Sequence, residues 1–138
     1  ALRQVDATLE LIGRVPREGS ATDRMRALIR LQAEHVATKQ DELVVFFQEL
    51  PWIEQHLDKE QAADLQRRID RYERFTRQLI TAGVKSGEFR DLKVNMVMYS
   101  IIGILAYVPN WFRGTARKAQ ESLVAELSEF VINGMLRR

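Results

Sequence analysis

The stretch VNMVMYSIIGILAYVPNWF, residues 94–112, contains no charged residue, although 29% of the chain is charged. In helical register its apolar side chains form two stripes on different sides of one helix. The first stripe holds Val94, Val97, Met98, Ile101, Leu105, Val108 and Phe112, and the second holds Met96, Tyr99, Gly103, Tyr107 and Trp111. A helix that is apolar on all sides must be covered on all sides, so we expect a covering beyond the core of one subunit.

A membrane, a ligand cavity or a second protein could supply that covering. A helix that crosses a bilayer needs roughly 20 predominantly apolar residues, and this stretch barely reaches that length. It also carries Asn95, Ser100 and Asn110, whose polar groups lipid would leave without hydrogen bonds. The N-terminal sequence lacks the long apolar core of a signal peptide. We therefore expect a cytoplasmic protein without a membrane partner.

Length and composition favour one folded domain. The 138 residues are enough for a single core, and we expect residues 1–138 to form it. A net charge of +2 argues against sequence-independent binding of nucleic acid, because such binding depends on clustered Lys and Arg side chains. The absence of cysteine excludes disulfides, thiolate catalysis and zinc sites built on cysteine.

Helical periodicity runs along the whole chain, which predicts an all-α bundle of about six helices. Ser20 and Asp58 have the spacing of N-caps, and Gly87 suits the left-handed end of the longest helix. We expect Pro51 to stop a short helix and Asp91 to cap the uncharged one. The last two helices are joined by a short turn, so we expect them to pack antiparallel.

The last helix repeats the two-stripe pattern of residues 94–112. Two neighbouring helices with spare apolar faces suit a two-fold related four-helix bundle, since the same patch then serves both subunits. This pattern predicts a homodimer, and the alternative is that both faces are buried in one monomeric core. The interface candidates are Ile101, Leu105, Val108, Phe112, Leu123, Leu127, Phe130 and Val131.

Bulky, aromatic and flexible side chains on the inward faces are candidates for lining a ligand cavity between the helices. They are Met25, Ile29, Phe46, Phe47, Trp52, Tyr72, Phe75, Met96, Tyr99, Tyr107 and Trp111. The three tyrosines among them add hydroxyls that can orient the polar end of a ligand. The alternative for each of these residues is an ordinary place in the core.

The sequence offers no set of catalytic or metal-binding residues. His35 and His56 are the only histidines, and their separation matches no metal-ligand spacing. Without a serine elbow or a glycine-rich phosphate loop, we expect no enzymatic activity, no metal and no cofactor. The long helix also carries arginines that either form surface ion pairs or hold an anionic ligand group at a pocket mouth. They are Arg67, Arg71, Arg74 and Arg77.

Several strings resemble the C-terminal ligand-binding and dimerisation domain of TetR-family transcriptional regulators. AGVKSGEFRDLKV, residues 82–94, is similar to the junction before the penultimate helix of that domain. NWFRG, residues 110–114, and LSEFVINGML, residues 127–136, are similar to the end of that helix and to the terminal helix. The resemblance covers nearly the whole chain and implies the family's fold, with the last two helices forming a dimer four-helix bundle.

The resemblance also implies a function. The family's N-terminal helix-turn-helix domain is absent from the sequence, and residues 1–13 correspond to the end of the helix that would connect to it. DNA would then be bound only through that missing domain. We expect an effector-sensing and dimerisation domain of a bacterial repressor, which binds an apolar acyl-CoA, a lipid or steroid catabolite, or a planar aromatic compound. The alternative is a helical protein-protein interaction module that senses no ligand.

Overall fold

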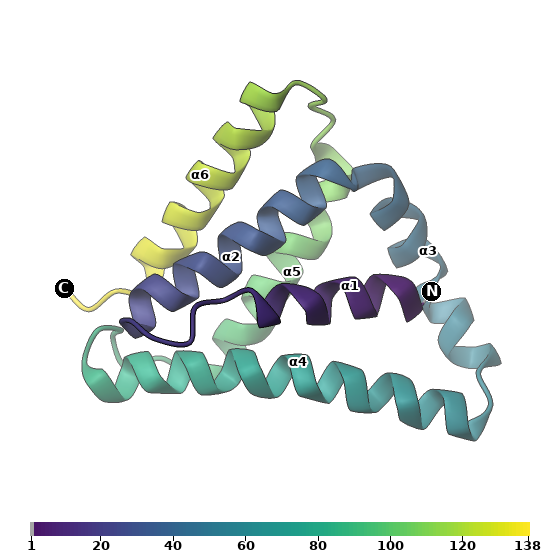
Figure 1. Cartoon of the computed structure of the whole chain (residues 1–138), viewed down its shortest axis with the longest axis horizontal. Coiled ribbons are helices and arrows are strands. Elements are labelled where there is room, and N and C mark those ends of the chain that lie inside the picture. The colour runs from purple at the N-terminus through teal and green to yellow at the C-terminus, as the bar shows by residue number, and fades with distance from the viewer. Residues whose placement is uncertain (1) are drawn as a thin grey trace.

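Helix α2 (Ala21–Thr38) is the element around which the other helices are arranged in the computed structural model, which describes residues 2–138 (Figure 1). Helices in contact with it are α1 (Leu2–Gly13), α3 (Gln40–His56), α4 (Lys59–Ser86), α5 (Val94–Trp111) and α6 (Arg117–Met135). The all-α fold with about six helices is therefore confirmed. The only extended pairing within the described part is an isolated bridge between Phe89 and Leu136.

The hydrophobic core lies along α2, because this helix buries side chains toward several neighbours at once. Met25, Leu28 and Ile29 are fully buried on it. They belong to the same cluster as Ile80 of α4 and Ile132 of α6. Burial of one such aliphatic side chain stabilises the fold by about 1.5–3 kcal/mol, so this cluster fixes the positions of the helices that frame the cavity described below.

Three local signals predicted helix ends correctly. The Ser20 hydroxyl accepts a hydrogen bond from the Asp23 N–H at 3.0 Å and so caps α2. Asp58 caps α4 through a reciprocal capping box with Gln61, at 2.7 and 3.2 Å. Gly87 ends α4 with a φ of 81°, in the left-handed region that glycine enters without strain.

Two predicted helix boundaries are wrong. Helix α3 continues through Pro51 to His56, and Figure 1 shows a bend along it, because proline removes the bond to the Phe47 carbonyl without ending the helix. Helix α5 begins after Lys93, without a side-chain cap, and not at Asp91. Residues 88–90 are held extended by backbone bonds to residues 135–137, so the helix starts later than local sequence indicates.

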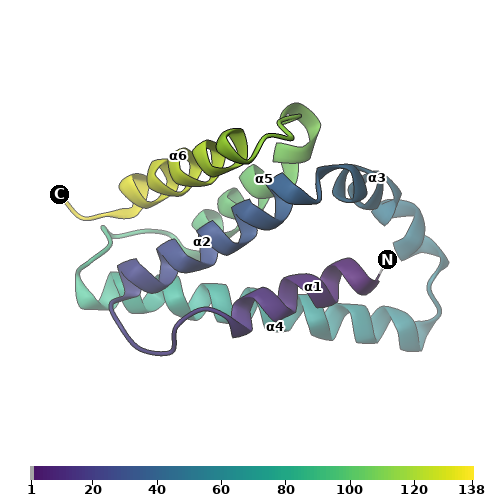
Figure 2. The same cartoon turned by 45° about the horizontal axis from the view of Figure 1, so that its top comes forward.

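The last two helices run antiparallel, as expected, but α2 lies between them, so they make few direct contacts with each other. Residues 112–116 join α5 to α6 at one end, and backbone hydrogen bonds between residues 88–90 and 135–137 tie the start of α5 to the end of α6 (Figures 1 and 2). Helix α2 packs against both of them. Its buried side chains therefore fill the space in which a direct α5–α6 contact was expected.

Helix α5 is the one helix in the described part of the chain that is long and apolar enough to cross a membrane by these two criteria. Only 28% of its residues are buried within the subunit. Ile101, Leu105 and Val108 of the first stripe are buried, whereas Met96, Tyr99, Tyr107 and Trp111 of the second are each at least 54% exposed. The first stripe thus faces the core, and the second is an uncovered apolar surface.

Candidate functional site

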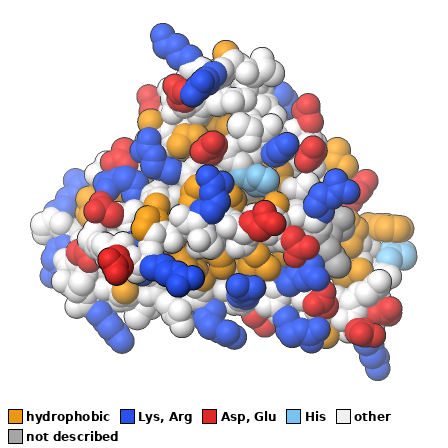
Figure 3. Space-filling view, viewed as in Figure 1, with side chains coloured by type: hydrophobic (Ala, Val, Ile, Leu, Met, Phe, Trp, Pro, Cys, Tyr) orange, Lys and Arg blue, Asp and Glu red, His pale blue; other side chains and the backbone are white. Residues whose placement is uncertain are grey.

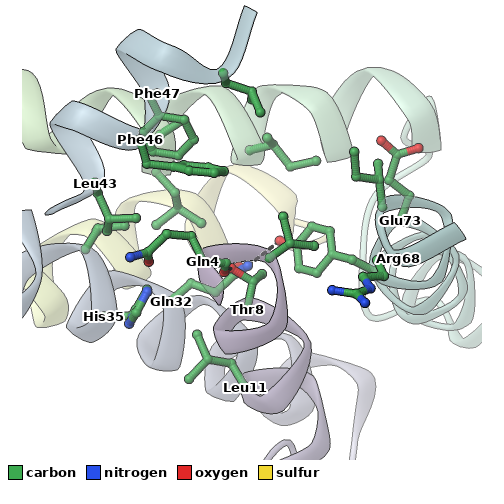
Figure 4. A pocket seen from close by; sticks show the side chains of 18 of the residues that line it. Gln4, Thr8, Leu11, Gln32, His35, Leu43, Phe46, Phe47, Arg68 and Glu73 are labelled. Atoms are coloured by element: carbon green, nitrogen blue, oxygen red, sulfur yellow. Dashed lines mark hydrogen bonds between the residues drawn. The ribbon is translucent and has the colours of Figure 1, made fainter. Parts of the chain in front are cut away.

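A cavity of about 220 Å³ lies among the first five helices (Figure 4). Its walls are Gln4, Val5, Thr8 and Leu11 of α1, Gln32, His35 and Val36 of α2, Leu43, Phe46, Phe47 and Leu50 of α3, Leu65, Arg68, Ile69, Tyr72 and Glu73 of α4, and Ile102, Leu105 and Ala106 of α5. Most of this lining is apolar. Five helices therefore contribute to one space, which is the usual place for a ligand in a helical bundle.

The α3 wall of the cavity depends on two consecutive aromatic residues. Phe46 and Phe47 meet edge to face with ring centroids 5.3 Å apart, and both pack against the small cluster of Val36, Leu43 and Val108. This cluster joins α2, α3 and α5. The phenylalanine rings consequently border the cavity at the place where α3 is anchored to the rest of the molecule (Figure 4).

A polar cluster interrupts the apolar lining on α2 and α4. The Gln32 amide donates a hydrogen bond to the Tyr72 hydroxyl, and Gln32 is only 7% exposed. Burial raises the pKa of Tyr72. Burial also lowers the pKa of His35, and the nearby Lys39 charge adds to this effect. Both side chains are therefore neutral near pH 7.

The charged groups at the cavity are paired with groups of opposite charge. Arg68 lies 2.9 Å from Asp6 of α1 and 2.8 Å from Asp64 of its own helix. Glu73 lies 3.8 Å from Arg77. Both acidic partners of Arg68 are on helices that line the cavity, so the Arg68 charge is already compensated by the protein.

The rest of the visible surface follows the same pattern of mixed charge. On the face shown in Figure 3, basic and acidic side chains alternate over the helices, and hydrophobic side chains show in small areas between them. Of the arginines on the outer side of α4, Arg67 pairs with Asp64 at 3.6 Å and Arg77 with Glu73 at 3.8 Å. These pairs match the ion-pair interpretation for Arg67 and Arg77, whereas Arg71 and Arg74 form no ion pair within residues 2–138.

The predicted ligand-contact residues are distributed over three environments. Phe46, Phe47 and Tyr72 line the cavity. Met25 and Ile29 are fully buried in the core, and Phe75 packs against it. The other five are exposed, with Trp52 stacked on His56 at 4.1 Å between ring centroids, and with Met96, Tyr99, Tyr107 and Trp111 on the outer face of α5.

The polar members of the lining, above all Gln32 and His35, were not among the predicted contacts. A signal for Gln32 is present in the sequence, because it is a polar residue within the apolar stripe of α2 formed by Met25, Leu28, Ile29 and Val36. A buried polar side chain is a more informative observation than another buried aliphatic one.

The predicted dimer-interface residues are also divided. Ile101, Leu105, Val108 and Val131 are buried inside the subunit. The exposed apolar face of α5 is therefore its second stripe, and not the stripe that was predicted to meet the other subunit. Phe112, Leu123 and Leu127 are half-buried against the cluster of Val36, Leu43 and Val108. Phe130 alone is strongly exposed, at 73%.

Comparison with known proteins gives a family match over most of the chain. The family described as Tetracyclin repressor-like, C-terminal domain, matches residues 18–135. No curated protein matches the chain. The family match includes α2 to α6, and so every helix of the cavity except α1.

Solved structures of TetR-type regulators share this fold. The ketosteroid transcriptional regulator KstR2 of Mycobacterium tuberculosis has a TM-score of 0.82 at 17% identity, over 97% of this chain and 68% of that chain. A regulatory protein of the tetR family from Rhodococcus RHA1 has a TM-score of 0.82 at 17% identity, over 99% and 70%. AibR in complex with isovaleryl coenzyme A and operator DNA has a TM-score of 0.74 at 19% identity, over 91% and 67%.

This chain spans about two thirds of the length of each of those regulators. At such low identities the likeness shows the fold alone, and the family match carries the assignment. The chain belongs to the TetR family of transcriptional regulators, and residues 18–135 are its Tetracyclin repressor-like C-terminal domain.

Proposed function

We propose that residues 1–138 form the effector-sensing and dimerisation domain of a bacterial transcriptional repressor that acts in the cytoplasm. The observation that carries this proposal is the apolar cavity of about 220 Å³ among five helices. It is larger than the engineered cavity of about 150 Å³ that binds benzene. It is smaller than the pockets of about 300–1,000 Å³ that hold drug-sized ligands. The cavity therefore suits a small apolar molecule, or the apolar part of a larger one.

The acyl group of a coenzyme A thioester is one such apolar part, and a lipid or steroid catabolite is the second class of effector. The names of two structural neighbours support these classes, since KstR2 is described as a ketosteroid regulator and AibR was crystallised with isovaleryl coenzyme A. The aromatic lining by Phe46 and Phe47 also suits a planar aromatic compound. Direct binding measurements distinguish these classes.

Helix α1 can carry the effect of ligand binding from the cavity to a DNA-binding domain. It supplies Gln4, Val5, Thr8 and Leu11 to the cavity wall and is tied to α4 by the Asp6–Arg68 pair. A ligand shifts α1 only if it binds two positions of that helix with different affinity. We propose that such a shift is passed to the DNA-binding domain that precedes this domain in the family, and that DNA is bound only there.

The exposed stripe of α5 supports a homodimer as the working form. Met96, Tyr99, Tyr107 and Trp111 lie on the outer side of α5, and a methyl group added at Gly103 between them would meet no described atom within 4 Å. Large exposed apolar areas mark interaction surfaces. We propose that this stripe and Phe130 of α6 meet their copies in a two-fold four-helix bundle.

The same stripe also favours a second candidate function, an interaction module that binds a different protein and senses no ligand. The two candidates differ in what the purified chain does alone. A sensor domain is expected to be a dimer that binds a small ligand. An interaction module is expected to be a monomer that binds none of the small molecules tested below. Sedimentation velocity and calorimetry on one sample distinguish them.

Isothermal titration calorimetry with isovaleryl coenzyme A, octanoyl coenzyme A, androstenedione and indole tests the sensor. We expect micromolar binding of at least one compound. The variant Ala106→Phe fills the cavity and is expected to weaken that binding at least tenfold, while Ala82→Phe, on the exposed side of α4, leaves it unchanged. Equal effects of the two variants, or no binding by any compound, would contradict the proposal.

A further inference from the structure

We infer that the part of the effector inside the cavity is uncharged and carries a hydroxyl group, and that Gln32 and His35 of α2 bind this hydroxyl at the cavity wall. The inference rests on the proposed function of the cavity. It adds the chemical class of the ligand and the two residues that select it.

Two buried polar atoms on this wall lack a partner. Within residues 2–138, neither Gln32 Oε1 nor His35 Nε2 has a hydrogen-bond partner, although both atoms are buried. Both residues line the cavity, and they lie three positions apart on one face of α2 (Figure 4). A buried polar group without a partner costs about 1–3 kcal/mol, so native proteins rarely keep two in one cavity wall.

A hydroxyl group offers the hydrogen-bond partners that both atoms need, because it donates one hydrogen bond and accepts others. Its O–H donates to the Gln32 carbonyl oxygen, and its oxygen accepts from the protonated Nε2 of neutral His35. If the Gln32 amide is turned, its carbonyl accepts from Tyr72 and its NH₂ faces the ligand, which a hydroxyl oxygen also satisfies. A carbonyl or ether oxygen only accepts, so it leaves one of these atoms unpaired in the first arrangement.

The absence of a free charge on the lining favours a neutral ligand over an anionic one. Arg68, the lining arginine, is compensated by Asp6 and Asp64, and Glu73 by Arg77. Burial lowers the pKa of His35, which keeps its imidazole uncharged near pH 7. A carboxylate in this cavity would lose its hydration without gaining an unpaired cation, which is unfavourable.

Calorimetry with three eight-carbon probes tests this assignment. 1-Octanol carries the hydroxyl, its isomer 1-methoxyheptane has the same atoms without an O–H, and octanoate is charged. We expect the native chain to bind 1-octanol about five- to tenfold more tightly than 1-methoxyheptane, which is the usual effect of one hydrogen bond. Octanoate is expected to bind more weakly than both.

The variants Gln32→Leu and His35→Phe replace the two groups with apolar side chains of similar size. Each is expected to weaken 1-octanol binding about fivefold and to leave 1-methoxyheptane within about twofold. Thr8→Val is the matched control, because Thr8 also lines the cavity but its hydroxyl already donates to the Gln4 carbonyl at 3.0 Å. Circular dichroism verifies that all three variants are folded.

The outcomes separate the inference from the proposal on which it rests. If the probes bind but 1-octanol and 1-methoxyheptane have equal affinity, the inference is wrong and the cavity remains a ligand site. The same holds if the preference for 1-octanol survives in both variants. If no probe and no compound of the earlier panel binds, the proposed sensing function is itself wrong.

Discussion

Glu88 shows how much of this fold depends on single polar contacts. Its carboxylate accepts hydrogen bonds from the Ser86 hydroxyl at 2.6 Å and from the N–H groups of Thr22 and Ala21 at 3.0 and 3.3 Å. The Ser86 hydroxyl and then the Thr22 N–H lower the pKa of Glu88 to about 2. Glu88 therefore caps the positive end of α2 from a distant part of the chain.

We predict that Glu88→Gln destabilises the protein by about 1 kcal/mol at pH 7, the usual effect of a lost cap. The folded pKa of Glu88 lies below its ordinary value of 4.5, so its stabilisation is complete above pH 4.5 and is lost as the pH falls toward about 2. Urea denaturation should show that the free energies of unfolding of the native protein and of Glu88→Gln differ less at pH 3 than at pH 7. Glu126→Gln, on an exposed part of α6, is the control. A difference independent of pH would contradict this account.

Residue-level signals predicted the local parts of the fold and missed the tertiary ones. Ser20, Asp58 and Gly87 were identified because a cap or a left-handed turn depends on a few neighbouring residues. Asp91 was misassigned because bonds to residues 135–137 hold the preceding segment extended. The unpartnered Oε1 of Gln32 depends on the arrangement of side chains from other helices, and no local pattern contains that information.

At the scale of elements, α5 shows what periodicity does and does not determine. The sequence indicated a helix with two apolar stripes and an uncovered face, and the structure contains both features. It could not indicate which stripe faces the core, because the two are similar in hydrophobicity. The aromatic residues Tyr99, Tyr107 and Trp111 were therefore assigned to a cavity, while the cavity is lined by α3 and α4 aromatics.

We predict that Tyr107→Lys weakens self-association at least tenfold, because it places a charge within the exposed α5 stripe. Sedimentation velocity over a concentration series measures this change. Val45→Lys is the matched control, since Val45 of α3 is also an exposed apolar residue, 51% accessible, but lies outside the stripe. If both variants associate like the native chain, the stripe is not the subunit contact.

At the scale of the whole molecule, stability is unevenly distributed between the helices. Helix α2 buries eight of its residues, whereas α3 buries only Gln40 and Leu43 and contains Pro51. Segments with few buried contacts open more readily than the core. The wall of the cavity formed by α3 is therefore the part of the molecule most able to separate from the rest.

Hydrogen exchange followed by mass spectrometry should reveal this distribution. We predict that amides of α3 exchange at least tenfold faster than those of α2 in the free protein. A saturating ligand from the calorimetric panel is expected to slow exchange in α3 and α1, which border the cavity, and to leave α6 unchanged. Equal protection of α2 and α3 in the free protein would contradict the prediction.

The central position of α2 has a consequence for the way the chain leaves the ribosome. The Glu88 cap of α2 is synthesised 66 residues after Thr22, and Glu129, which pairs with Arg26 at 2.8 Å, follows that arginine by 103 residues. During that interval the nascent α2 has its apolar faces uncovered and its first turn capped by Ser20 alone. Its assembly must therefore wait for α6, and the growing chain is an expected client of chaperones that bind exposed apolar helices.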